Sequence, residues 1–284
     1  MDSSKFLILG ANGQLGKALQ AKYPDAEKTD SNNLDITNSE TLKNYDWSDI
    51  EIIINAAAYT NVDGAETEEG KVVAWAVNDR AVGNVAEIAK ANNLLLVHVS
   101  TDYVFNGTKS PHKEDEPFSP LGVYGKTKAA GDEKAAKTPK YYIVRTSWVI
   151  GDGKNFVRTM LELGKKGVVP AVVADQIGRP TFAVELARAI DHLLKIQPEF
   201  GTYNVTNSGE SVSWADFTRA IFKEAGYHLN VTDTTTSEYF ASKPGVAPRP
   251  LNSLLDLAKI ATTGFKPKDW HEDLKQYIKK ELNA

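Results

Sequence analysis

Short apolar runs alternate with longer amphipathic stretches through the first half of the chain. Four runs have the aliphatic character of strands that are buried on both faces of a parallel sheet: residues 5–9, 50–54, 94–100 and 141–144. Residues 77–89 instead repeat apolar side chains three and four positions apart, which predicts a helix with one buried face. This alternation predicts an α/β fold, a Rossmann-type doubly wound parallel sheet with helices on both faces.

The pattern changes after residue 168. Short strand-like runs then alternate with amphipathic helical stretches, and the chain closes on a helical stretch at residues 270–282. We therefore expect a dinucleotide-binding Rossmann domain over residues 1–150 and a smaller C-terminal lobe, mainly substrate-binding, over residues 151–284. Segments of residues 151–250 are expected to return to the first domain.

A glycine motif follows the first strand directly. It has the form GxxGxxG and leads into a helical pattern; its residues are Gly10, Asn12, Gly13, Gln14, Leu15 and Gly16. Glycines in this position allow a tight turn and a close approach of the backbone to a pyrophosphate, and the amides of the next helix face the anion. The motif predicts a dinucleotide site, with a turn that only caps a structural helix as the alternative.

Two carboxylates follow at spacings that suit an adenosine. Asp30 lies twenty positions after Gly10, where a carboxylate usually meets the ribose, and Asp35 with Ile36 is a candidate for the adenine edge. For Asp35, a helix cap leading into residues 37–45 is about as good an interpretation. The second strand is poorly marked and Lys28 is close by, so the choice between NADH and NADPH stays open.

Small residues end the third strand. Ala56, Ala57 and Ala58, followed by Tyr59, leave room for a cofactor ribose against the backbone, although close helix packing would also explain them. Asn78 is expected at the start of the next helix, where it either hydrogen-bonds backbone near the site or caps the helix.

A tyrosine and a lysine stand four residues apart after the fourth strand. Tyr124 and Lys128 would share one face of a helix, and Thr101 ends the preceding strand. A nearby ammonium stabilises a phenolate and lowers the pKa of the phenol, so such a tyrosine could protonate a developing alkoxide. YxxxK also occurs by chance in many helices, so these three catalytic candidates gain weight only from the other motifs.

Three further residues lie beyond strand ends or beside prolines. Trp148 could pack on a substrate ring or belong to the core. Arg249 and Arg179 each precede a proline, a rigid placement that suits bidentate hydrogen bonds to a diphosphate. For Arg179, an ordinary surface arginine is the preferred interpretation.

Composition narrows the class of protein. The 284 residues are 42% hydrophobic and 25% charged, with a formal net charge of −4, which argues against nucleic acid as a partner and against a membrane-spanning chain. The absence of cysteine excludes disulfides, thiol nucleophiles and cysteine-ligated metals. The first apolar run is too short for a secretory signal, and a cytoplasmic location fits.

Several motifs together resemble the dTDP-4-dehydrorhamnose reductases, a family of extended short-chain dehydrogenase/reductases. The resemblance runs through essentially the whole chain, and its motifs lie at residues 10–16, 55–58, 100–105, 124–128, 145–148, 175–181 and 249–250. It implies the last step of dTDP-L-rhamnose synthesis, in which a hydride of NADPH or NADH reduces C4 of a 4-keto-6-deoxy sugar nucleotide.

The resemblance also implies roles for individual residues. Tyr124 would donate the proton, Lys128 would hold the nicotinamide ribose and lower the tyrosine pKa, and Thr101 would bind near the keto oxygen. The substrate candidates are Thr101, Asp102, Tyr103 and Trp148 around the sugar, and Asn155 and Arg249 at the nucleotide.

One departure from the family pattern concerns metal. Some members resemble metal-bridged dimers with a carboxylate two residues after the third glycine, where this chain has Ala18, and Glu185 alone cannot replace a carboxylate cluster. We therefore expect no metal and a monomer.

Two rival functions remain. A sugar-nucleotide dehydratase or epimerase shares the fold, but resemblance to the dehydratases would require Asp-Glu after the threonine, where this chain has Asp102 and Tyr103. A non-catalytic regulator similar to the regulatory subunit of methionine adenosyltransferase need not keep Thr101, Tyr124 and Lys128. This chain keeps all three.

Overall fold

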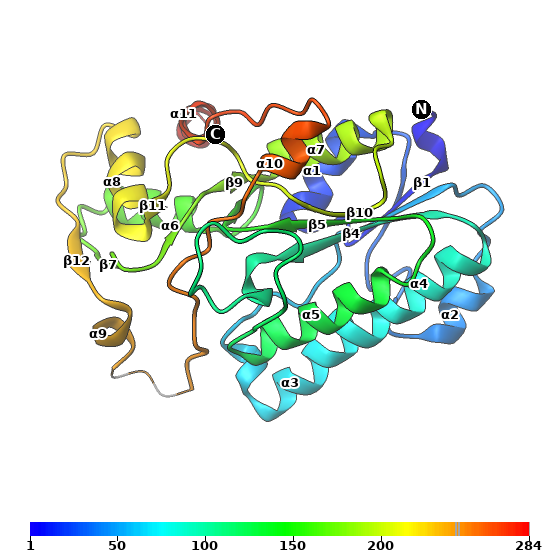
Figure 1. Cartoon of the computed structure of the whole chain (residues 1–284). Helices are drawn as coiled ribbons and strands as arrows, with labels where there is room; N and C mark the ends of the chain where they lie inside the picture. The colour runs from blue at the N-terminus through cyan, green and yellow to red at the C-terminus, as the bar shows by residue number, and fades with distance from the viewer. Residues whose placement is uncertain (242, 244, 284) are drawn as a thin grey trace.

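The computed structural model describes residues 1–241, 243 and 245–283 of the chain. Within them, six parallel strands form a sheet in the order β10-β5-β4-β3-β1-β2 (Figure 1). The strands are β1 (Phe6–Leu9), β2 (Glu27–Thr29), β3 (Ile52–Asn55), β4 (Leu95–Thr101), β5 (Tyr141–Thr146) and β10 (Gly201–Asn204). The doubly wound parallel sheet predicted from the sequence is confirmed.

Helices cover both faces of this sheet (Figure 1). One face carries α1 (Gln14–Lys22) and α7 (Ala183–Ile196); the other carries α2 (Ser39–Asn44), α3 (Glu68–Trp75), α4 (Ala81–Ala91) and α5 (Val123–Ala135). Side chains of a strand alternate between faces. Ile8 therefore packs with Leu19 and Ile190 on the first face, while Leu7 packs with Val85 on the second.

The helical stretch predicted over residues 77–89 is longer in the structure, where it runs from Glu68 to Ala91. Helix α3 begins after Thr67, whose hydroxyl caps the amide of Gly70 at 3.0 Å, and continues through a π-helical turn (Ala76–Arg80) into α4. Asn78 therefore lies inside the helical stretch, and the prediction that it starts the helix is wrong. Val72 and Val73 are exposed, which obscures the apolar period of α3 in the sequence.

A second lobe packs against one end of the sheet (Figure 1). Its helices include α6 (Phe156–Lys165), α8 (Trp214–Glu224), α9 (Thr236–Phe240) and α11 (Trp270–Leu282), and α10 (Ala258–Thr262) lies near α7. Short strands pair within it: β6 (Val149–Ile150) with β9 (Thr181–Phe182), β7 (Ala171–Val173) with β12 (Thr232–Thr234), and β8 (Ile177–Gly178) with β11 (Val212–Ser213). Phe217, Phe222 and Trp270 belong to its buried core.

Part of the C-terminal half returns to the main sheet. Strand β10 pairs with β5, with Gly201 opposite Tyr142, and α7 packs with α1. A short apolar run does not indicate which sheet it joins, so the sequence pattern grouped residues 201–205 with the lobe. The domain boundary at residue 150 stays a prediction.

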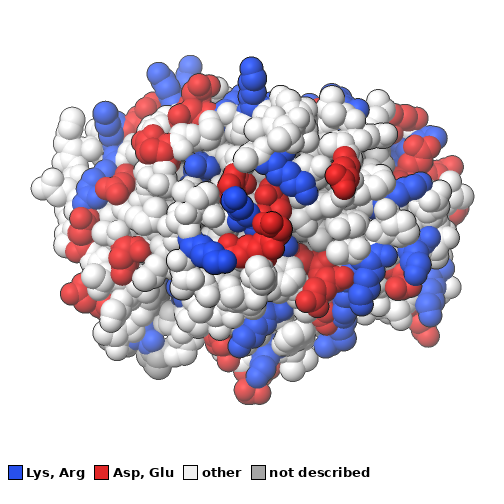
Figure 2. All heavy atoms as spheres, viewed as in Figure 1, with Lys and Arg blue, Asp and Glu red and all other residues white. Residues whose placement is uncertain are grey.

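The exterior of the molecule carries both signs of charge. Lysine and arginine are interspersed with aspartate and glutamate over the face shown in Figure 2, so the electrostatic potential there is mixed. Across the part of the chain that the structure describes, no helix combines the length and the apolarity needed to cross a membrane.

Candidate active site

The glycine motif forms a turn that needs glycine at two points. Gly10 has φ of 76°, in the left-handed region, and a Cβ on it would lie 2.6 Å from the amide nitrogen of Ala57. A Cβ on Gly16 would overlap the carbonyl oxygen of Gly10. Helix α1 starts directly after the N-cap Gly13, so its first amides stand at the turn, where an anion binds. The backbone itself therefore forms this part of the site.

A groove of about 350 Å³ opens beside this turn, and we name it the cofactor groove. Predicted cofactor residues make up most of its lining: Gly10, Asn12, Gly13, Asp30, Asp35, Ile36, Ala56, Ala57, Ala58 and Tyr59. It lies at the carboxyl ends of β1 and β3, where the strand order reverses and where such sheets bind their ligands. Ser31, Leu34, Thr37 and Val77 also line it and carried no signal in the sequence.

The two carboxylates of the groove are held by local hydrogen bonds. The side-chain amide of Asn12 donates to Asp30, which also accepts from the amide of Asn32 at 2.8 Å. Asp35 accepts from the amide and the hydroxyl of Thr37 at 2.9 and 2.7 Å. Helix α2 is capped by Asn38, so the helix-cap interpretation of Asp35 is wrong. Both carboxylates line the groove.

Four predicted cofactor residues do not line the groove but lie next to its wall. Leu15 and Gly16 are buried in α1. The Gln14 side chain accepts a hydrogen bond from the amide of Gly151 at 2.8 Å, which ties the turn to the segment after β6. Asn78 accepts from the amide of Tyr59 at 2.8 Å and donates to its carbonyl at 3.0 Å. These residues fix the shape of the groove wall.

The three catalytic candidates lie on adjacent elements. Thr101 ends β4, and Tyr124 and Lys128 stand one turn apart on α5, which packs against β4. The lysine is 1% exposed, and its ammonium donates to the carbonyl of Val99 at 2.7 Å. The tyrosine is 9% exposed. The structure therefore brings together the acid, the cation and the hydroxyl that the sequence predicted.

The pKa values of this pair differ from the expectation. Burial raises the pKa of Tyr124 above its ordinary value, the neighbouring Thr101 hydroxyl opposes the rise, and the charges of Asp102 and Asp132 add to it. Burial lowers the pKa of Lys128 to about 8, and Asp132 opposes that change. Desolvation of the phenolate dominates for the chain by itself, so the net change in the tyrosine pKa is a rise where the sequence predicted a lowering.

A buried polar network lies beneath Lys128. Its ammonium is 3.4 Å from Nε2 of His98, and Arg145 pairs with Asp132 at 3.1 Å. Burial, with the charge of Lys128, lowers the pKa of His98 well below its ordinary value, so this imidazole is neutral. The network holds the lysine in one position. The sequence reasoning missed it because its members come from three separate segments.

Thr101 is oriented by the residue that follows it. Its hydroxyl donates to Asp102 at 3.0 Å and accepts from the amide of Tyr103 at 3.2 Å. Asp102 is 2% exposed, and burial raises its pKa to about 6 although hydrogen bonds from Ser253 and Thr101 oppose the rise. Asp102 is buried in the chain by itself and orients Thr101, and its predicted role in binding the substrate stays a prediction.

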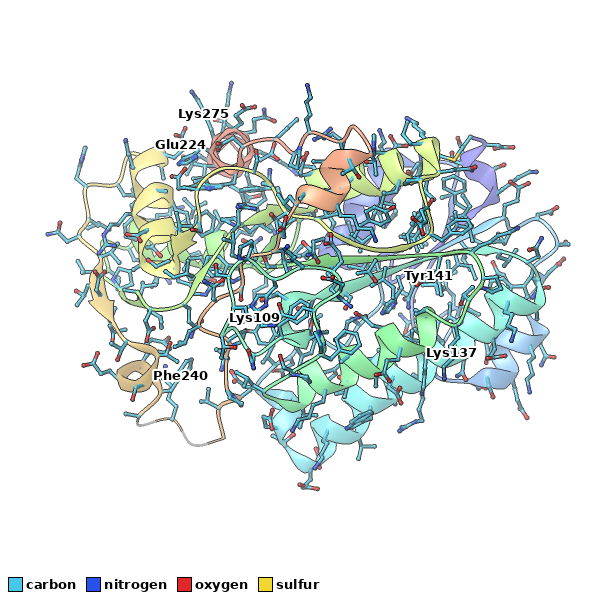
Figure 3. The ribbon with its side chains drawn as sticks, viewed as in Figure 1. Lys109, Lys137, Tyr141, Glu224, Phe240 and Lys275 are labelled. Atoms are coloured by element: carbon cyan, nitrogen blue, oxygen red, sulfur yellow. The ribbon has the colours of Figure 1, made fainter. Side chains whose placement is uncertain are left out.

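A second cavity, of about 480 Å³, opens between the lobe and the sheet domain, and we name it the substrate cleft. Its lining combines aliphatic side chains of α6 and β7 with aromatic and long polar side chains, namely Tyr103, Phe156, Gln176, Trp214, Tyr239, Phe240 and Arg249. The guanidinium of Arg249 lies 4.7 Å from the ring centroid of Phe240, which Figure 3 labels on α9. Such a cleft suits a ligand with flat rings and an anionic group.

Trp148 supports the cleft through a second tryptophan. Its φ of 48° is left-handed, and its ring stacks on that of Trp214 with centroids 3.6 Å apart and planes 15° apart. A Cβ on Gly178 would lie 2.7 Å from the Trp148 ring, so the ring is clamped between the two. Trp214 lines the cleft and was not predicted, because only the fold brings it to Trp148.

Two other predicted residues have structural partners. Asn155 caps α6 and donates to the carbonyl of Gly151 and the hydroxyl of Tyr277, both at 2.8 Å. These bonds engage its side-chain amide within α6 and α11, and its assignment to the nucleotide stays a prediction. Arg179 is half-buried and donates to the carbonyl of Gly209 at 3.1 Å, so it is not the surface arginine we preferred.

The groove and the cleft meet at Tyr124. Tyr59 lines the cofactor groove, Tyr103 lines the substrate cleft, and both pack in one cluster with Tyr124. The rings of Tyr103 and Tyr124 meet edge to face with centroids 5.5 Å apart. The phenol predicted as the acid therefore belongs to a cluster that includes one lining residue of each cavity.

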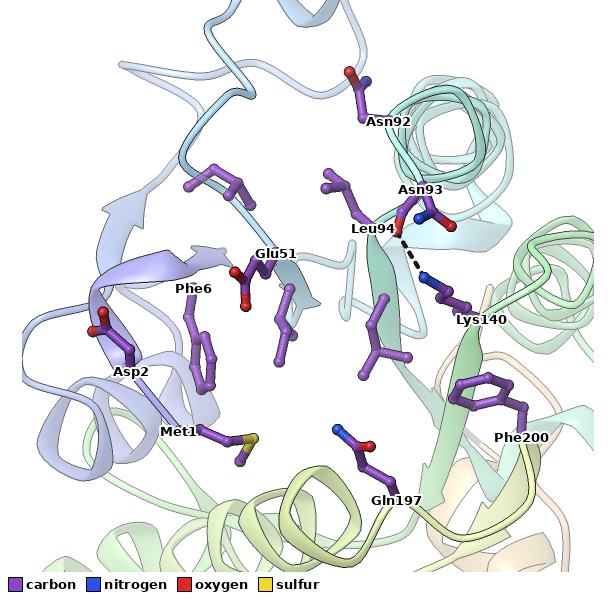
Figure 4. Close-up of a pocket in the computed structure, with 13 residues that line it drawn as sticks. Met1, Asp2, Phe6, Glu51, Asn92, Asn93, Leu94, Lys140, Gln197 and Phe200 are labelled. Carbon is purple, nitrogen blue, oxygen red and sulfur yellow. Dashed lines mark hydrogen bonds between the residues drawn. The ribbon is translucent and has the colours of Figure 1, made fainter.

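Another cavity, of about 530 Å³, opens at the opposite edge of the sheet (Figure 4). Its lining includes Phe6, Glu51, Leu94 and Lys140, the last donating to the carbonyl of Asn93 at 3.3 Å. None of the predicted site residues lines it. Because open α/β sheets bind ligands at the carboxyl ends of their strands, we assign the site to the groove and the cleft.

A protein site for a metal ion needs several acidic or histidine side chains close together. Among the described residues, no group of three or more such side chains could hold a metal ion. Glu185 is buried and pairs with Arg188 at 2.6 Å, while it accepts from the amide of Lys268 at 2.8 Å. Its oxygens therefore bind Arg188 on the same helix and join α7 to the segment before α11.

The glycine turn at the switch point and the tyrosine–lysine pair on α5 define an extended short-chain dehydrogenase/reductase. Within this class, the chain belongs to the dTDP-4-dehydrorhamnose reductase family. A family profile described as the RmlD substrate binding domain matches residues 4–283. The resemblance drawn from the sequence motifs is confirmed.

Similar proteins cover the chain nearly from end to end. A dTDP-4-dehydrorhamnose reductase of Aggregatibacter actinomycetemcomitans is 42% identical over 293 residues, covering 96% of this chain and 97% of the relative. The crystal structure of a dTDP-4-dehydrorhamnose reductase from Clostridium acetobutylicum matches with a TM-score of 0.90 at 39% identity, covering 98% and 99% of the two chains. That of the Bacillus anthracis reductase in complex with NADP gives 0.89 at 37% identity, covering 97% and 98%.

Proposed function

We propose that the protein reduces the C4 ketone of dTDP-4-dehydro-L-rhamnose to dTDP-L-rhamnose with NADPH or NADH, the last step of dTDP-rhamnose biosynthesis. One observation carries the proposal: Tyr124 packs edge to face on Tyr103 of the substrate cleft and shares a hydrophobic cluster with Tyr59 of the cofactor groove. A ketone reductase needs a proton donor at the point where cofactor and substrate meet.

The cofactor groove fits a dinucleotide. Gly10 and Gly16 leave no room for a side chain at the turn, so the backbone can approach a pyrophosphate, and Ala56 to Ala58 keep the wall low beside it. We assign Asp30 to the adenosine ribose and Asp35 with Ile36 to the adenine, because all three line this groove. When bound, the reduced nicotinamide supplies the hydride.

Tyr124 supplies the proton. The ketone carbon gains the hydride, its oxygen takes the phenolic proton, and the tyrosine recovers a proton from solvent, so the cofactor is oxidised and the ketone becomes an alcohol. The raised pKa keeps Tyr124 protonated at neutral pH, as a donor must be. An alkoxide is far more basic than a phenolate, so the transfer remains favourable.

Thr101 and Lys128 position the reaction. Thr101 is held by Asp102 next to the phenol, and Lys128 is fixed by the carbonyl of Val99 one helical turn away. We assign Thr101 to the neighbourhood of the keto oxygen and Lys128 to the nicotinamide ribose. A charged lysine there also stabilises the phenolate that remains after proton transfer.

The substrate cleft supplies the contacts to the nucleotide sugar. Tyr103 lies beside Tyr124, where the sugar would sit, and Trp214, backed by Trp148, offers a flat ring. Arg249 carries the positive charge that a diphosphate needs, in the bidentate geometry that a guanidinium provides.

The test is turnover of defined substrates. Purified protein is mixed with NADPH or NADH and with 4-keto-6-deoxy sugar nucleotides carrying dTDP or UDP, and cofactor oxidation is followed together with product analysis. We expect oxidation with the dTDP keto sugar and formation of dTDP-L-rhamnose. Binding of cofactor and sugar nucleotide without turnover would instead support the regulator, and conversion of dTDP-glucose to a keto sugar would support a dehydratase.

A further inference from the structure

The segment that joins β3 to α3 touches both halves of the site. It runs over residues 56–67 and includes the short helix η2 (Gly64–Glu66). Its first part lines the cofactor groove, and Val62 and Ala65 pack in the cluster around Tyr124. Two of its side chains, Asp63 and Glu66, hydrogen-bond to other segments of the site. The proposed mechanism gives neither of them a task.

Asp63 binds the segment that carries Arg249, the arginine proposed to contact the substrate diphosphate. One carboxylate oxygen pairs with Nη2 of Arg249 at 2.8 Å, and the other accepts from the amide of Ala247 at 3.0 Å. Arg249 also donates through Nη1 to the carbonyl of Ala247 at 2.7 Å and lies over the ring of Phe240. The arginine side chain is thereby fixed from several sides, at the wall of the cleft.

Glu66 holds the start of the catalytic helix. Its carboxylate accepts from the amide of Val123 at 2.7 Å, the first residue of α5, and a Cβ on the N-cap Gly122 would lie 2.7 Å from the same oxygen. Gly122 has no side chain with which to cap the helix, so a carboxylate from a distant segment does this instead. Tyr124 is the next residue along the helix.

We propose that Asp63 and Glu66 are positioning residues, which set the substrate arginine and the catalytic helix from one segment of chain. Asp63 orders Arg249 for the nucleotide diphosphate and so acts on substrate affinity. Glu66 fixes the first turn of α5 and so acts on the proton transfer by Tyr124. The inference rests on the proposed function, because it takes Arg249 as a diphosphate contact and Tyr124 as the acid.

The carboxylate of Asp63 fixes the Arg249 side chain but also repels the phosphates of the substrate. We expect the gain from fixing the arginine to be the larger effect. A free arginine loses much rotamer freedom when it binds an anion, and a side chain that is already fixed avoids this loss. The carboxylate is 48% exposed, so water screens its charge, and both of its oxygens already accept hydrogen bonds. The guanidinium has five donors and can keep Asp63 while it binds a phosphate.

The first experiment removes the charge of Asp63 and keeps its shape. Asp63→Asn keeps an oxygen for the amide of Ala247 and loses the ion pair to Arg249. We expect the Kd of dTDP, measured by calorimetry with cofactor present, and the KM of the keto sugar nucleotide to rise about fivefold to tenfold, with kcat within about twofold. Glu68→Gln, at an exposed carboxylate of α3, is the charge-matched control and should change nothing.

A double-mutant cycle shows whether Asp63 acts through Arg249. Arg249→Met should raise the Kd of dTDP by at least as much as Asp63→Asn, and adding Asp63→Asn to it should have no further effect. An equal additional rise in the double variant would overturn the inference for Asp63, as would dTDP binding that is unchanged or tighter in Asp63→Asn.

The second experiment concerns the other carboxylate. Glu66→Ala should lower kcat about fivefold at an unchanged KM, while Glu66→Gln, which keeps an acceptor for the amide of Val123, should restore kcat to within about twofold. A merely structural role would lower the thermal midpoint without this division between kcat and KM. Loss of substrate affinity in Glu66→Ala, or a kcat equal to wild type, would overturn this part.

Failure of the inference can be distinguished from failure of the proposed function. If the wild-type protein does not reduce any keto sugar nucleotide, the proposed function fails before a variant is made. If it does, and the variants show no division between affinity and turnover, the positioning roles fail alone.

Discussion

The cofactor groove and the substrate cleft are built from different parts of the chain. The groove combines glycine and alanine at the ends of β1 and β3 with polar and aliphatic side chains of the segment from Asp30 to Thr37, and its lining residues all come from residues 9–77. The cleft consists of large side chains, and its lining spans residues 103–249. One cavity is defined by where the backbone runs, and the other by which side chains the fold brings together.

This difference separates what each cavity can change. Where backbone forms the wall of the groove, its shape is fixed, because it can change only if strands of the central sheet move. A cleft made of aromatic rings and one arginine can accept substitutions that alter substrate preference while the sheet stays intact. Tyr124 belongs to neither set alone, since it packs against both. Variants at these three places should therefore give three different kinetic patterns.

The largest effect is expected where the two cavities meet. Tyr124→Phe keeps the ring in its cluster and removes the proton, so kcat should fall by about 10²- to 10⁴-fold, as for loss of a general acid. The Kd of the cofactor and of dTDP should stay within about twofold of wild type. Stopped-flow measurement of cofactor oxidation checks the first value and fluorescence titration the second. Wild-type turnover would remove Tyr124 from the mechanism.

The second effect should be confined to the cofactor groove. Gly10→Ala forces a side chain into a left-handed conformation and against the amide of Ala57, so cofactor affinity should fall by at least about tenfold. Gly264→Ala is the matched control, because Gly264 has φ of 88° and open space around its Cβ position. Both variants lose stability, but only Gly10→Ala should change the Kd of the cofactor. An equal loss of affinity in both would break the comparison.

The third effect should be confined to the substrate cleft. Trp214→Ala removes a ring that lines the cleft and supports Trp148, so the KM of the nucleotide sugar should rise about tenfold, while cofactor affinity stays unchanged. Trp214→Phe, which keeps an aromatic face, should lie between Trp214→Ala and wild type. If Trp214→Ala instead weakens the cofactor, the two cavities are not separate.

The fourth effect is a dependence of cofactor affinity on pH, caused by the titration of Lys128. Burial lowers the pKa of Lys128 to about 8, so the lysine is charged below that pH and loses its proton above it. Cofactor affinity should therefore weaken as pH rises from 7 to 9, with a midpoint near 8. Lys128→Met should bind more weakly and show no midpoint in this range. The raised pKa of Tyr124 keeps that group protonated throughout, so it does not contribute.

The smallest effect is expected from removing metal ions. The family resemblance drawn from the sequence implies a carboxylate at this position in metal-bridged members, where this chain has Ala18, and Glu185 is already paired with Arg188. A chelator should therefore leave turnover within about twofold, and light scattering should give the mass of one chain with or without it. A dimer that falls apart in chelator, with loss of activity, would contradict this expectation.

The contrast between the groove and the cleft also explains how much of each could be predicted from the sequence. The groove could be predicted well because its determinants are local: a glycine turn follows a strand, and small residues follow another. The edge strand β2 was poorly marked because two of its three residues, Glu27 and Lys28, are exposed, so few apolar side chains are needed there. Strand positions within the sheet could not be inferred for β10, since register and neighbours are tertiary properties.

The cleft could be predicted only in part. Tyr103 and Arg249 lie within motifs and were found, and Gln176 lies in the motif at residues 175–181 but was not singled out. Trp214 and Phe240 come from segments outside the motifs. The pKa of Tyr124 was predicted in the wrong direction because burial cannot be judged from spacing on a helix. Asp63 and Glu66 were missed for a similar reason: their partners lie far away in sequence.

The most direct test of the account is a crystal structure with oxidised cofactor and dTDP-L-rhamnose bound. The account predicts that the dinucleotide fills the cofactor groove, that the nucleotide sugar fills the substrate cleft, and that the phenolic oxygen of Tyr124 lies within hydrogen-bond distance of the sugar's C4 oxygen, with the nicotinamide on the other side of C4. A sugar bound elsewhere, such as in the cavity of Figure 4, or a phenol turned away from C4, would contradict it.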